Sequence, residues 1–349
     1  MLGLGNNLAR GGVLGFSNTY SLDFDGTNDY VDVGTAYNGV KSISFLLKVD
    51  DVTSNTDYIL GLNDTDYISV VDGTVTLSGF SGGTNTIYVD ASEASTVDTA
   101  WHHILITSTT ARNASNCDLG RTQSNNSYNM VGNLDEVAFT SDVKSASDFA
   151  DGTTPLDISG LSNLQNWWRM GDGVLDDGNV TGNGLIADQV NPTLSAFVED
   201  DCADDSISAG WDSLVTSDIS FDTDHYDLTW TGNNNVGMDA TIVANKIYKI
   251  TCDIKIKTDW SGNLRFYNYN GDPSTGNSYG DSRKSEVNTS SYTTITEYLP
   301  SLGGGAGQIG FNVNTAGAIS IKNFKAETVN GNPGLMTNMD AVDIVKDTP

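Results

Sequence analysis

The chain has 349 residues, of which 45 are Asp or Glu and 17 are Lys or Arg, so its formal net charge is −28. This charge excludes sequence-independent binding to nucleic acid and attraction to an anionic membrane surface, because both carry negative charge. Hydrophobic residues make up 38% of the chain and form no run of about 20 residues, so we expect no membrane insertion.

Alternating apolar and polar residues predict short β-strands from Tyr20 onward. The expected strands in the first half are 21–25, 30–33, 41–49, 58–62, 67–71, 74–80, 86–89, 101–107 and 134–139. Clusters of Asn, Asp, Gly and Ser separate them, which is typical of antiparallel strands in a sandwich. Helical signal is nearly absent, and only Ser145–Ala150 predicts a single turn, with Ser145 as its N-cap.

A second β-pattern follows an acidic segment at 199–205. Residues 246–257 alternate strictly, with Tyr248 and Ile250 on one face and Lys249, Lys255 and Lys257 on the other. Further strands are expected at 264–269, 309–313 and 318–324. The fold class is therefore all-β, with two antiparallel sandwiches.

Three cysteines lie far apart in the chain, at Cys117, Cys202 and Cys252. Their number and spacing favour buried free thiols over a disulfide framework, and a single Cys202–Cys252 bridge remains an alternative. Residues 1–17 are rich in glycine and lack the basic and apolar regions of a Sec signal peptide. We expect them to be a linker or an anchor to a partner.

The first β-region resembles the laminin-G-like, concanavalin-A-type jelly roll. The matching segments are Ser21–Val33 (SLDFDGTNDYVDV), Trp101–Ile104, Asp118–Arg121 and Gly132–Phe139. A hairpin that the family usually places between the second and third segments is missing here. The resemblance implies a sandwich of two antiparallel sheets.

A Trp-Arg strand that usually precedes the first strand in that family occurs here afterwards, within Leu164–Gly173. Its expected continuation is divided between Gly182–Asp188 and Gly334–Met339. This order implies a permuted jelly roll whose last strand is interrupted by a second domain. Together with the ending DIVKDTP, the arrangement is similar to that of marine bacteriophage virion proteins.

Residues 197–328 resemble a carbohydrate-binding module of the galactose-binding-like jelly-roll kind, on the motifs Gly210–Trp211, Ala244–Ile250 and Ala318–Phe324. Lys322 stands where the family commonly has Asp, which puts its usual structural calcium in doubt. The expected organisation is an anchor at 1–17, a laminin-G-like sandwich at 18–195, an inserted carbohydrate-binding-module-like sandwich at 196–329, and a returning segment at 330–349.

No catalytic constellation stands out. A glycosidase needs two carboxylates on one strand face, whereas Asp135 and Glu136 are adjacent and are expected to point to opposite faces. The histidines His102, His103 and His225 accompany no nucleophile elbow. We therefore expect no enzyme and no catalytic residues.

Calcium is the one cofactor that the sequence suggests. Carboxylates of Asp25, Asp29 and Asp135, with Asp23 and Asp32 nearby in sequence, offer oxygen ligands at the rim of the first sandwich. The alternative is that these residues are solvated turn and strand positions on an acidic surface.

Sugars bind to flat aromatic rings bordered by polar side chains. Arg265, Tyr267 and Tyr269 share one face of a predicted strand, with Trp260 before it and Tyr279 after it. These five residues form the candidate carbohydrate site. The alternative is that the rings cover a sheet edge or pack on another subunit. Trp167 and Trp168 are expected to pack in the core and between domains rather than to bind sugar.

The resemblances favour a non-enzymatic bacteriophage structural protein, such as a fibre, capsid decoration or tail component, that binds host-surface glycans and lies on the virion surface. Its expected partners are other virion proteins, through residues 1–17, those glycans, and further copies of the chain in a homo-oligomer. The alternatives are a secreted bacterial adhesin or glycan-binding protein in the extracellular space, and a polysaccharide hydrolase.

Overall fold

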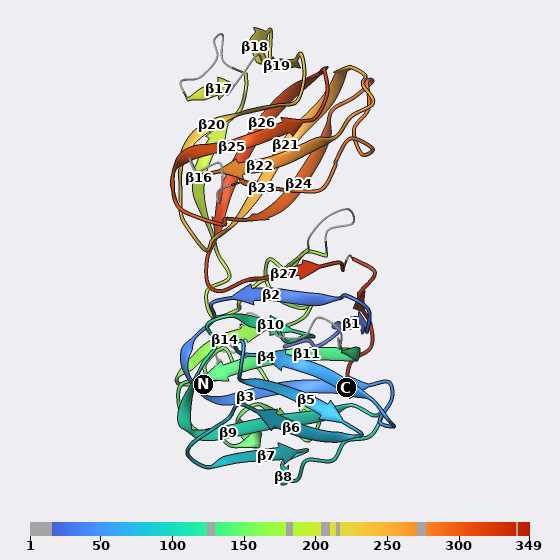
Figure 1. Cartoon of the computed structure of the whole chain (residues 1–349), viewed down its shortest axis with the longest axis vertical. Coiled ribbons are helices and arrows are strands. Elements are labelled where there is room, and N and C mark those ends of the chain that lie inside the picture. The colour runs from blue at the N-terminus through green and yellow to red at the C-terminus, as the bar shows by residue number, and fades with distance from the viewer. Residues whose placement is uncertain are drawn as a thin grey trace, which may run out of the picture.

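The computed structural model describes residues 16–123, 130–178, 184–203, 210–213, 217–270, 277–339 and 341–349. These residues form two β-sandwiches, one above the other in Figure 1. Neighbouring strands pair antiparallel in both, as in β1 (Ser21–Asp25) with β11 (Val131–Thr140) and in β21 (Ile247–Thr258) with β26 (Gly317–Val329). The prediction of an all-β fold of antiparallel sandwiches is confirmed. Within the described ranges, no helix is long and apolar enough to cross a membrane.

The first sandwich contains an eight-stranded sheet in the order β28-β1-β11-β3-β9-β7-β8, with β14 also paired to β11. Its strands are β1 (Ser21–Asp25), β3 (Asn38–Val49), β7 (Asn85–Val89), β8 (Ser92–Glu93), β9 (His102–Asn113), β11 (Val131–Thr140), β14 (Leu164–Trp168) and β28 (Ile344–Val345).

A seven-stranded sheet faces it, in the order β15-β27-β2-β10-β4-β5-β6. Its strands are β2 (Tyr30–Gly34), β4 (Thr56–Gly61), β5 (Tyr67–Val71), β6 (Thr74–Ser78), β10 (Cys117–Leu119), β15 (Leu185–Ile186) and β27 (Gly334–Thr337).

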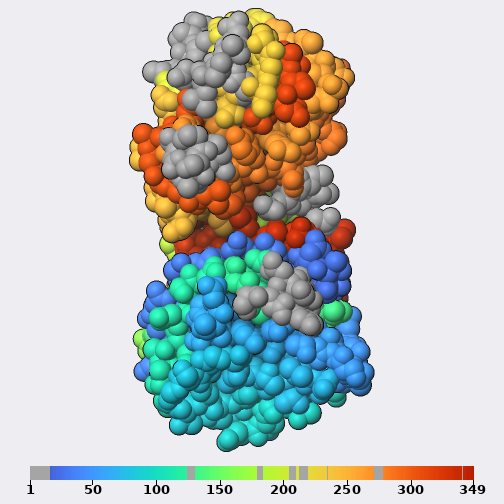
Figure 2. Space-filling model, viewed as in Figure 1, coloured from blue at the N-terminus to red at the C-terminus, as the bar shows by residue number. Residues whose placement is uncertain are grey.

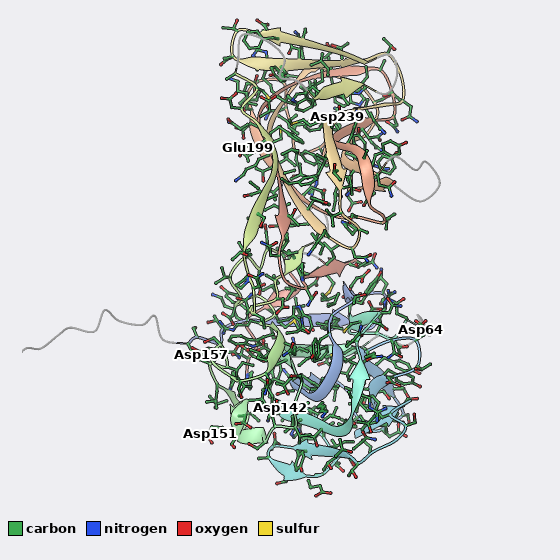
Figure 3. All side chains as sticks on the ribbon, turned by 90° about the vertical axis from the view of Figure 1, so that its left-hand side faces the viewer. Asp64, Asp142, Asp151, Asp157, Glu199 and Asp239 are labelled. Carbon is green, nitrogen blue, oxygen red and sulfur yellow. The ribbon has the colours of Figure 1, made fainter. Side chains whose placement is uncertain are left out.

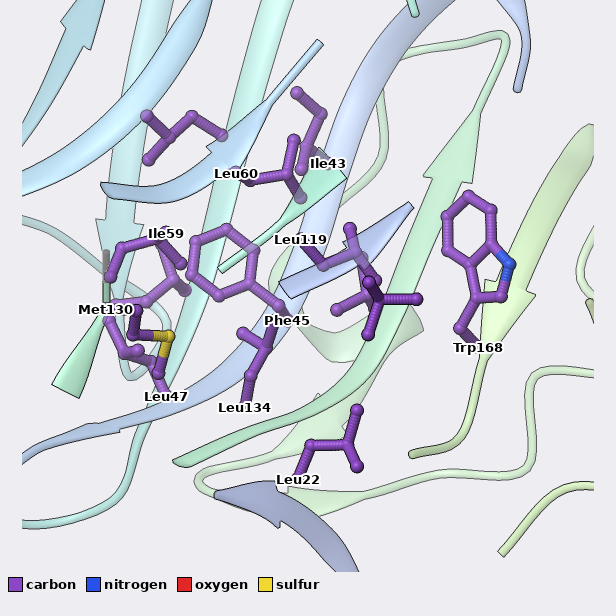
Figure 4. Close-up of a cluster of buried hydrophobic side chains, with 14 of the residues drawn as sticks. Leu22, Ile43, Phe45, Leu47, Ile59, Leu60, Leu119, Met130, Leu134 and Trp168 are labelled. Atoms are coloured by element: carbon purple, nitrogen blue, oxygen red, sulfur yellow. The ribbon is translucent and has the colours of Figure 1, made fainter. Parts of the chain in front are cut away.

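Alternate residues of both sheets point inward and form one core (Figure 4). Phe45 on β3 and Leu119 on β10 are completely buried there, and Trp168 closes the core from β14, edge-on to Phe139. Burial of these apolar side chains is the main stabilising contribution to the sandwich. Trp168 is a core residue, as the sequence predicts.

A smaller cluster covers the outer face of the eight-stranded sheet. It contains the 3₁₀ turn η1 (Ala146–Asp148) and the two-stranded sheet of β12 (Ala150–Asp151) and β13 (Thr154–Pro155). Ser145 is the N-cap of η1 in a capping box with Asp148, which confirms the one predicted turn. Trp167 packs in this cluster and stacks on Phe16 at a centroid distance of 6.3 Å.

The second sandwich packs a six-stranded sheet, in the order β18-β19-β26-β21-β24 with β16 also paired to β26, against a five-stranded sheet, in the order β17-β20-β25-β22-β23. The first sheet comprises β16 (Leu194–Asp200), β18 (Ser217–Asp222), β19 (His225–Trp230), β21 (Ile247–Thr258), β24 (Thr293–Pro300) and β26 (Gly317–Val329). The second comprises β17 (Trp211–Ser213), β20 (Asn234–Ile242), β22 (Leu264–Tyr269), β23 (Asn277–Tyr279) and β25 (Gly305–Val313).

The chain returns to the first sandwich after the second. Strand β27 pairs with β2 and β15, and β28 pairs with β1. In Figure 2 the red C-terminal residues accordingly lie where the two lobes of the molecule meet. A small apolar cluster joins the sandwiches there, and in it the Tyr298 hydroxyl donates a hydrogen bond of 2.9 Å to Asp177.

One expectation about strand geometry is wrong. Asp135 and Glu136 do not point to opposite faces, because the register between β11 and β3 shifts after Asp135 and Glu136 has a φ of +49°. Both carboxyl groups are buried on this face, where Glu136 forms an ion pair with Arg169 at 3.0 Å and its charge adds to the effect of burial on Asp135. Burial raises the pKa of Glu136 to about 7 and that of Asp135 well above its ordinary value.

The cysteine expectation holds for all three residues. Cys117, Cys202 and Cys252 are free and buried, and burial raises the pKa of each thiol. Buried protonated thiols are poor nucleophiles, so these residues serve as small apolar core side chains.

Candidate functional site

The outer face of β22 and β23 gathers most of the predicted sugar-contacting residues. Tyr267 lies opposite Tyr279 in the pairing of these strands, and their rings stack at a centroid distance of 6.3 Å. Tyr269 and Arg265 flank Tyr267 on the same face, each half-buried. We call this surface the tyrosine face. It forms because residues two apart on a strand point the same way, while Phe266 points into the core.

Glycines let the Tyr267 ring lie flat across the sheet. Tyr267 pairs with Gly310 on β25, which in turn pairs with Gly237 on β20. The Tyr267 hydroxyl reaches as far as Gly237, where an added Cβ would lie 3.0 Å from it. A Cβ on Gly310 would lie 2.3 Å from the carbonyl oxygen of Val236, so glycine also permits close approach of the strands.

Polar side chains border the rings on the neighbouring strands. The Tyr267 hydroxyl donates to Gln308 Oε1 at 2.9 Å, and Gln308 Nε2 donates to Asp239 at 3.2 Å. Asn312 and Asn235 form a second polar pair at 2.6 Å in the row of Arg265. An open groove of about 530 Å³ continues from Gln308 and Asp239 over small residues of β20 and β25.

The individual rings have different roles. Tyr279 is 41% exposed and presents its ring to solvent, whereas Tyr267 is completely buried and supports it. Trp260 does not belong to the tyrosine face. It lies between β21 and β22, packs against the core, and covers Gly317, where an added Cβ would lie 2.6 Å from the indole.

The structure does not assemble the predicted calcium ligands. Asp25 and Asp29 lie together at the turn between β1 and β2, where the Asp25 N–H donates to Asp29 at 3.0 Å. Burial raises the pKa of Asp29 to about 6. Asp135 lies four residues beyond the partner of Asp25 along β11 and accepts a hydrogen bond from Asn18 at 2.8 Å. The three carboxylates form no common site, because the register of β1 and β11 separates them.

A different acidic group lies close together on the second sandwich. Ligand atoms of Asp222, His225 and Asp227 are within 4.8 Å of one another. The Lys257 ammonium already contacts Asp227, and Ser320 donates to it at 2.7 Å. A histidine ligand does not suit calcium, which takes oxygen ligands. A metal here would have to displace Lys257.

No family model matches the chain, and no curated protein matches it. Three solved structures that resemble it are carbohydrate-binding modules. They are the CBM22-1 xylan-binding domain of Paenibacillus barcinonensis Xyn10C (11% identity, 40% of this chain and 97% of that chain, TM-score 0.31), the CBM22-1–CBM22-2 tandem of the same protein (8%, 86% and 79%, 0.28), and CBM6cm-2 of Cellvibrio mixtus lichenase 5A in complex with cellotriose (17%, 39% and 99%, 0.24). At these TM-scores the likenesses carry no argument, and they do not bear on the laminin-G or phage resemblance.

The sequence patterns did not identify the polar border of the tyrosine face. Strand β20, which supplies Asn235 and Asp239, was not expected, because its Gly and Asn residues weaken the alternation. On β25 the sequence does contain an alternating pattern that could have identified the polar border. Gln308, Gly310 and Asn312 alternate with Ile309 and Phe311, which are buried in the core.

Proposed function

We propose that this protein binds glycans through the tyrosine face of the second sandwich and catalyses no reaction on them. The observation that supports this is the exposed ring of Tyr279, stacked on Tyr267 beside an open groove with Gln308 and Asp239 at its border. A pyranose ring has an apolar face that fits an aromatic ring and hydroxyl groups that fit amide and carboxylate side chains.

Acidic residues are spread over both sandwiches, from Asp64 and Asp142 on the first to Glu199 and Asp239 on the second (Figure 3). Polysaccharides with many negative charges would be repelled by this surface and by the net charge of −28. The glycan of the tyrosine face is therefore proposed to be uncharged.

The absence of catalysis is part of the proposal. The adjacent carboxyl groups Asp135 and Glu136 are 0% and 7% exposed. The close pair of Ser44 Oγ and His103 Nε2, 2.8 Å apart, is also buried, and burial lowers the pKa of His103 to about 4. None of these groups is open to a polymeric substrate. Release of reducing sugar that is lost on replacing a single carboxylate would refute this part of the proposal.

The binding test uses Tyr279→Ala against the matched control Tyr279→Phe, which keeps the ring. Titration calorimetry with cello- and xylo-oligosaccharides should show an affinity loss of about tenfold or more for Tyr279→Ala, corresponding to about 1.4 kcal/mol of lost stacking. The Phe variant should stay close to the native protein. Equal affinity of the native and Ala proteins, or no binding to any glycan of a broad panel, would contradict the proposal.

From the resemblance to phage virion proteins, we further propose that the chain displays this face on a virion surface, as a fibre, decoration or tail component. Residues 1–15 of the proposed anchor lie outside the described residues. Phe16 and Ser17 contact Trp167 and Arg169 of the first sandwich. A Δ1–15 variant therefore keeps these contacts, and its loss from particles would support the anchor. Normal incorporation of Δ1–15, or antibody labelling of a bacterial surface instead of particles, would count against it.

A further inference from the structure

A cleft of about 400 Å³ lies where the two sandwiches meet. The first sandwich contributes Asp32 on β2 and the loop residue Asn116, and the second contributes Lys246 and Leu302. Asn332, in the segment that returns to the first sandwich, also lines it. Its size falls within the range of small-molecule sites, which occur preferentially at domain interfaces.

Hydrogen bonds hold each wall of the cleft in place. On the second sandwich, Ser301 Oγ donates to the carbonyl oxygen of Val243 at 2.5 Å and accepts from the Lys246 N–H at 3.0 Å. In the returning segment, the Asn332 carbonyl oxygen accepts from the indole of Trp168 at 2.8 Å. On the first sandwich, Thr35 donates to a neighbouring carbonyl oxygen at 3.1 Å. The cleft is thus formed before any ligand arrives, which lowers the entropic cost of binding.

The cleft combines one cation with one carboxylate. Lys246 and Asp32 form an ion pair neither with each other nor with any other described residue, although the charge of Arg121 acts on Asp32 at longer range. Leu302 is 62% exposed at the cleft, so an apolar surface lies beside these charges. A ligand that suits this arrangement brings an acidic group to the ammonium, hydroxyl donors to the carboxylate, and an apolar ring face to Leu302.

We propose that this interdomain cleft is a second ligand site, which takes a disaccharide-sized sugar bearing one carboxylate. In it, Lys246 binds the sugar carboxylate and Asp32 accepts hydrogen bonds from sugar hydroxyls. A single ammonium binds carboxylate as a point charge. Ligands with several negative charges are disfavoured by the net charge of −28. The cleft shares no residue with the tyrosine face, so ligand binding at one site can be tested independently of binding at the other.

The test compares cellobiouronic acid, which has one carboxylate, with cellobiose, its neutral counterpart. Calorimetric titration of the full chain should show about tenfold tighter binding of the acid. Lys246→Gln should abolish this preference, and Asp32→Asn should weaken both sugars. Lys255→Gln is the matched control, because Lys255 is also half-buried and forms no ion pair with a carboxylate among the described residues, but lies on β21 beside Tyr292. It should leave both affinities unchanged.

Tyr279→Ala separates this site from the tyrosine face, since it should not alter the preference for the acid. The bound acid should also protect Lys246, but not Lys255, from acetylation read out by mass spectrometry. The proposal is overturned if the native chain does not bind the acid at millimolar concentration, if Lys246→Gln binds it as well as the native chain, or if Lys255→Gln loses as much affinity as Lys246→Gln.

Discussion

Asp118 on β10 makes the stability of the first sandwich depend on pH in an unusual direction. Its side chain is completely buried opposite Asp32. One carboxylate oxygen accepts from Arg121 at 2.8 Å, while the other accepts no hydrogen bond from the described residues. Burial raises the pKa of Asp118 to about 7, with a contribution from the charge of Asp32 and opposed by Arg121.

The first sandwich is expected to become less stable as the pH rises, because folding favours the protonated form of Asp118. The folded pKa of about 7 exceeds the reference value of 3.8, so the folded protein binds the proton more tightly than the unfolded chain. Below a pH of about 4, Asp118 is protonated in both states and does not lower the free energy of unfolding. Ionisation of Asp118 lowers this free energy progressively between pH of about 4 and about 7, and by a constant amount above that. The full cost is about 4 kcal/mol as an upper bound.

Asp118→Asn removes this titration and keeps an acceptor for Arg121. The free energy of unfolding of the native protein should fall between pH 5 and pH 8 by up to about 3 kcal/mol more than that of the variant, because part of the full cost already arises between pH 4 and pH 5. Urea unfolding at both pH values, with hydrogen exchange of β10 to isolate the first sandwich, measures the difference. The substitution also changes the stability of the variant by an amount that does not vary with pH, so only the pH dependence decides. Asp51→Asn is the control, because Asp51 is exposed and hydrogen bonds from Thr53 lower its pKa. Parallel pH profiles of Asp118→Asn and the native protein would refute the reasoning.

Other contacts give further tests. Tyr298→Phe removes the hydrogen bond to Asp177 and should destabilise the junction by about 1 to 2 kcal/mol, measured as faster hydrogen exchange in β27 with unchanged exchange in β22. Phe16→Ala should expose the stacked indole of Trp167 and shift the tryptophan emission to longer wavelength, and an unshifted spectrum would contradict this packing. A thiol reagent such as dithionitrobenzoate should label no cysteine in the native protein and three in urea, because all three thiols are buried and free.

Much of the candidate site was accessible from the sequence, and part of it was not. Strict alternation placed Arg265, Tyr267 and Tyr269 on one strand face, because side chains on a β-strand have a period of two. The same rule does not say which ring remains exposed. Tyr267 is buried because glycines on two neighbouring strands let its ring lie down, and those strands are about 40 residues away on β25 and about 30 residues away on β20.

The local patterns by themselves determined that this protein is built from short antiparallel strands, with free cysteines and a capped turn at Ser145. These features depend on neighbours in sequence, on side-chain period and on residue type. Only the tertiary structure decided how distant segments meet. The pairing register separated Asp135 from Asp25, a shift in register brought Asp135 and Glu136 together, and the return of the chain through β27 created the cleft between the sandwiches. Such meetings depend on strand order and register across the whole sheet, which no short stretch of sequence encodes.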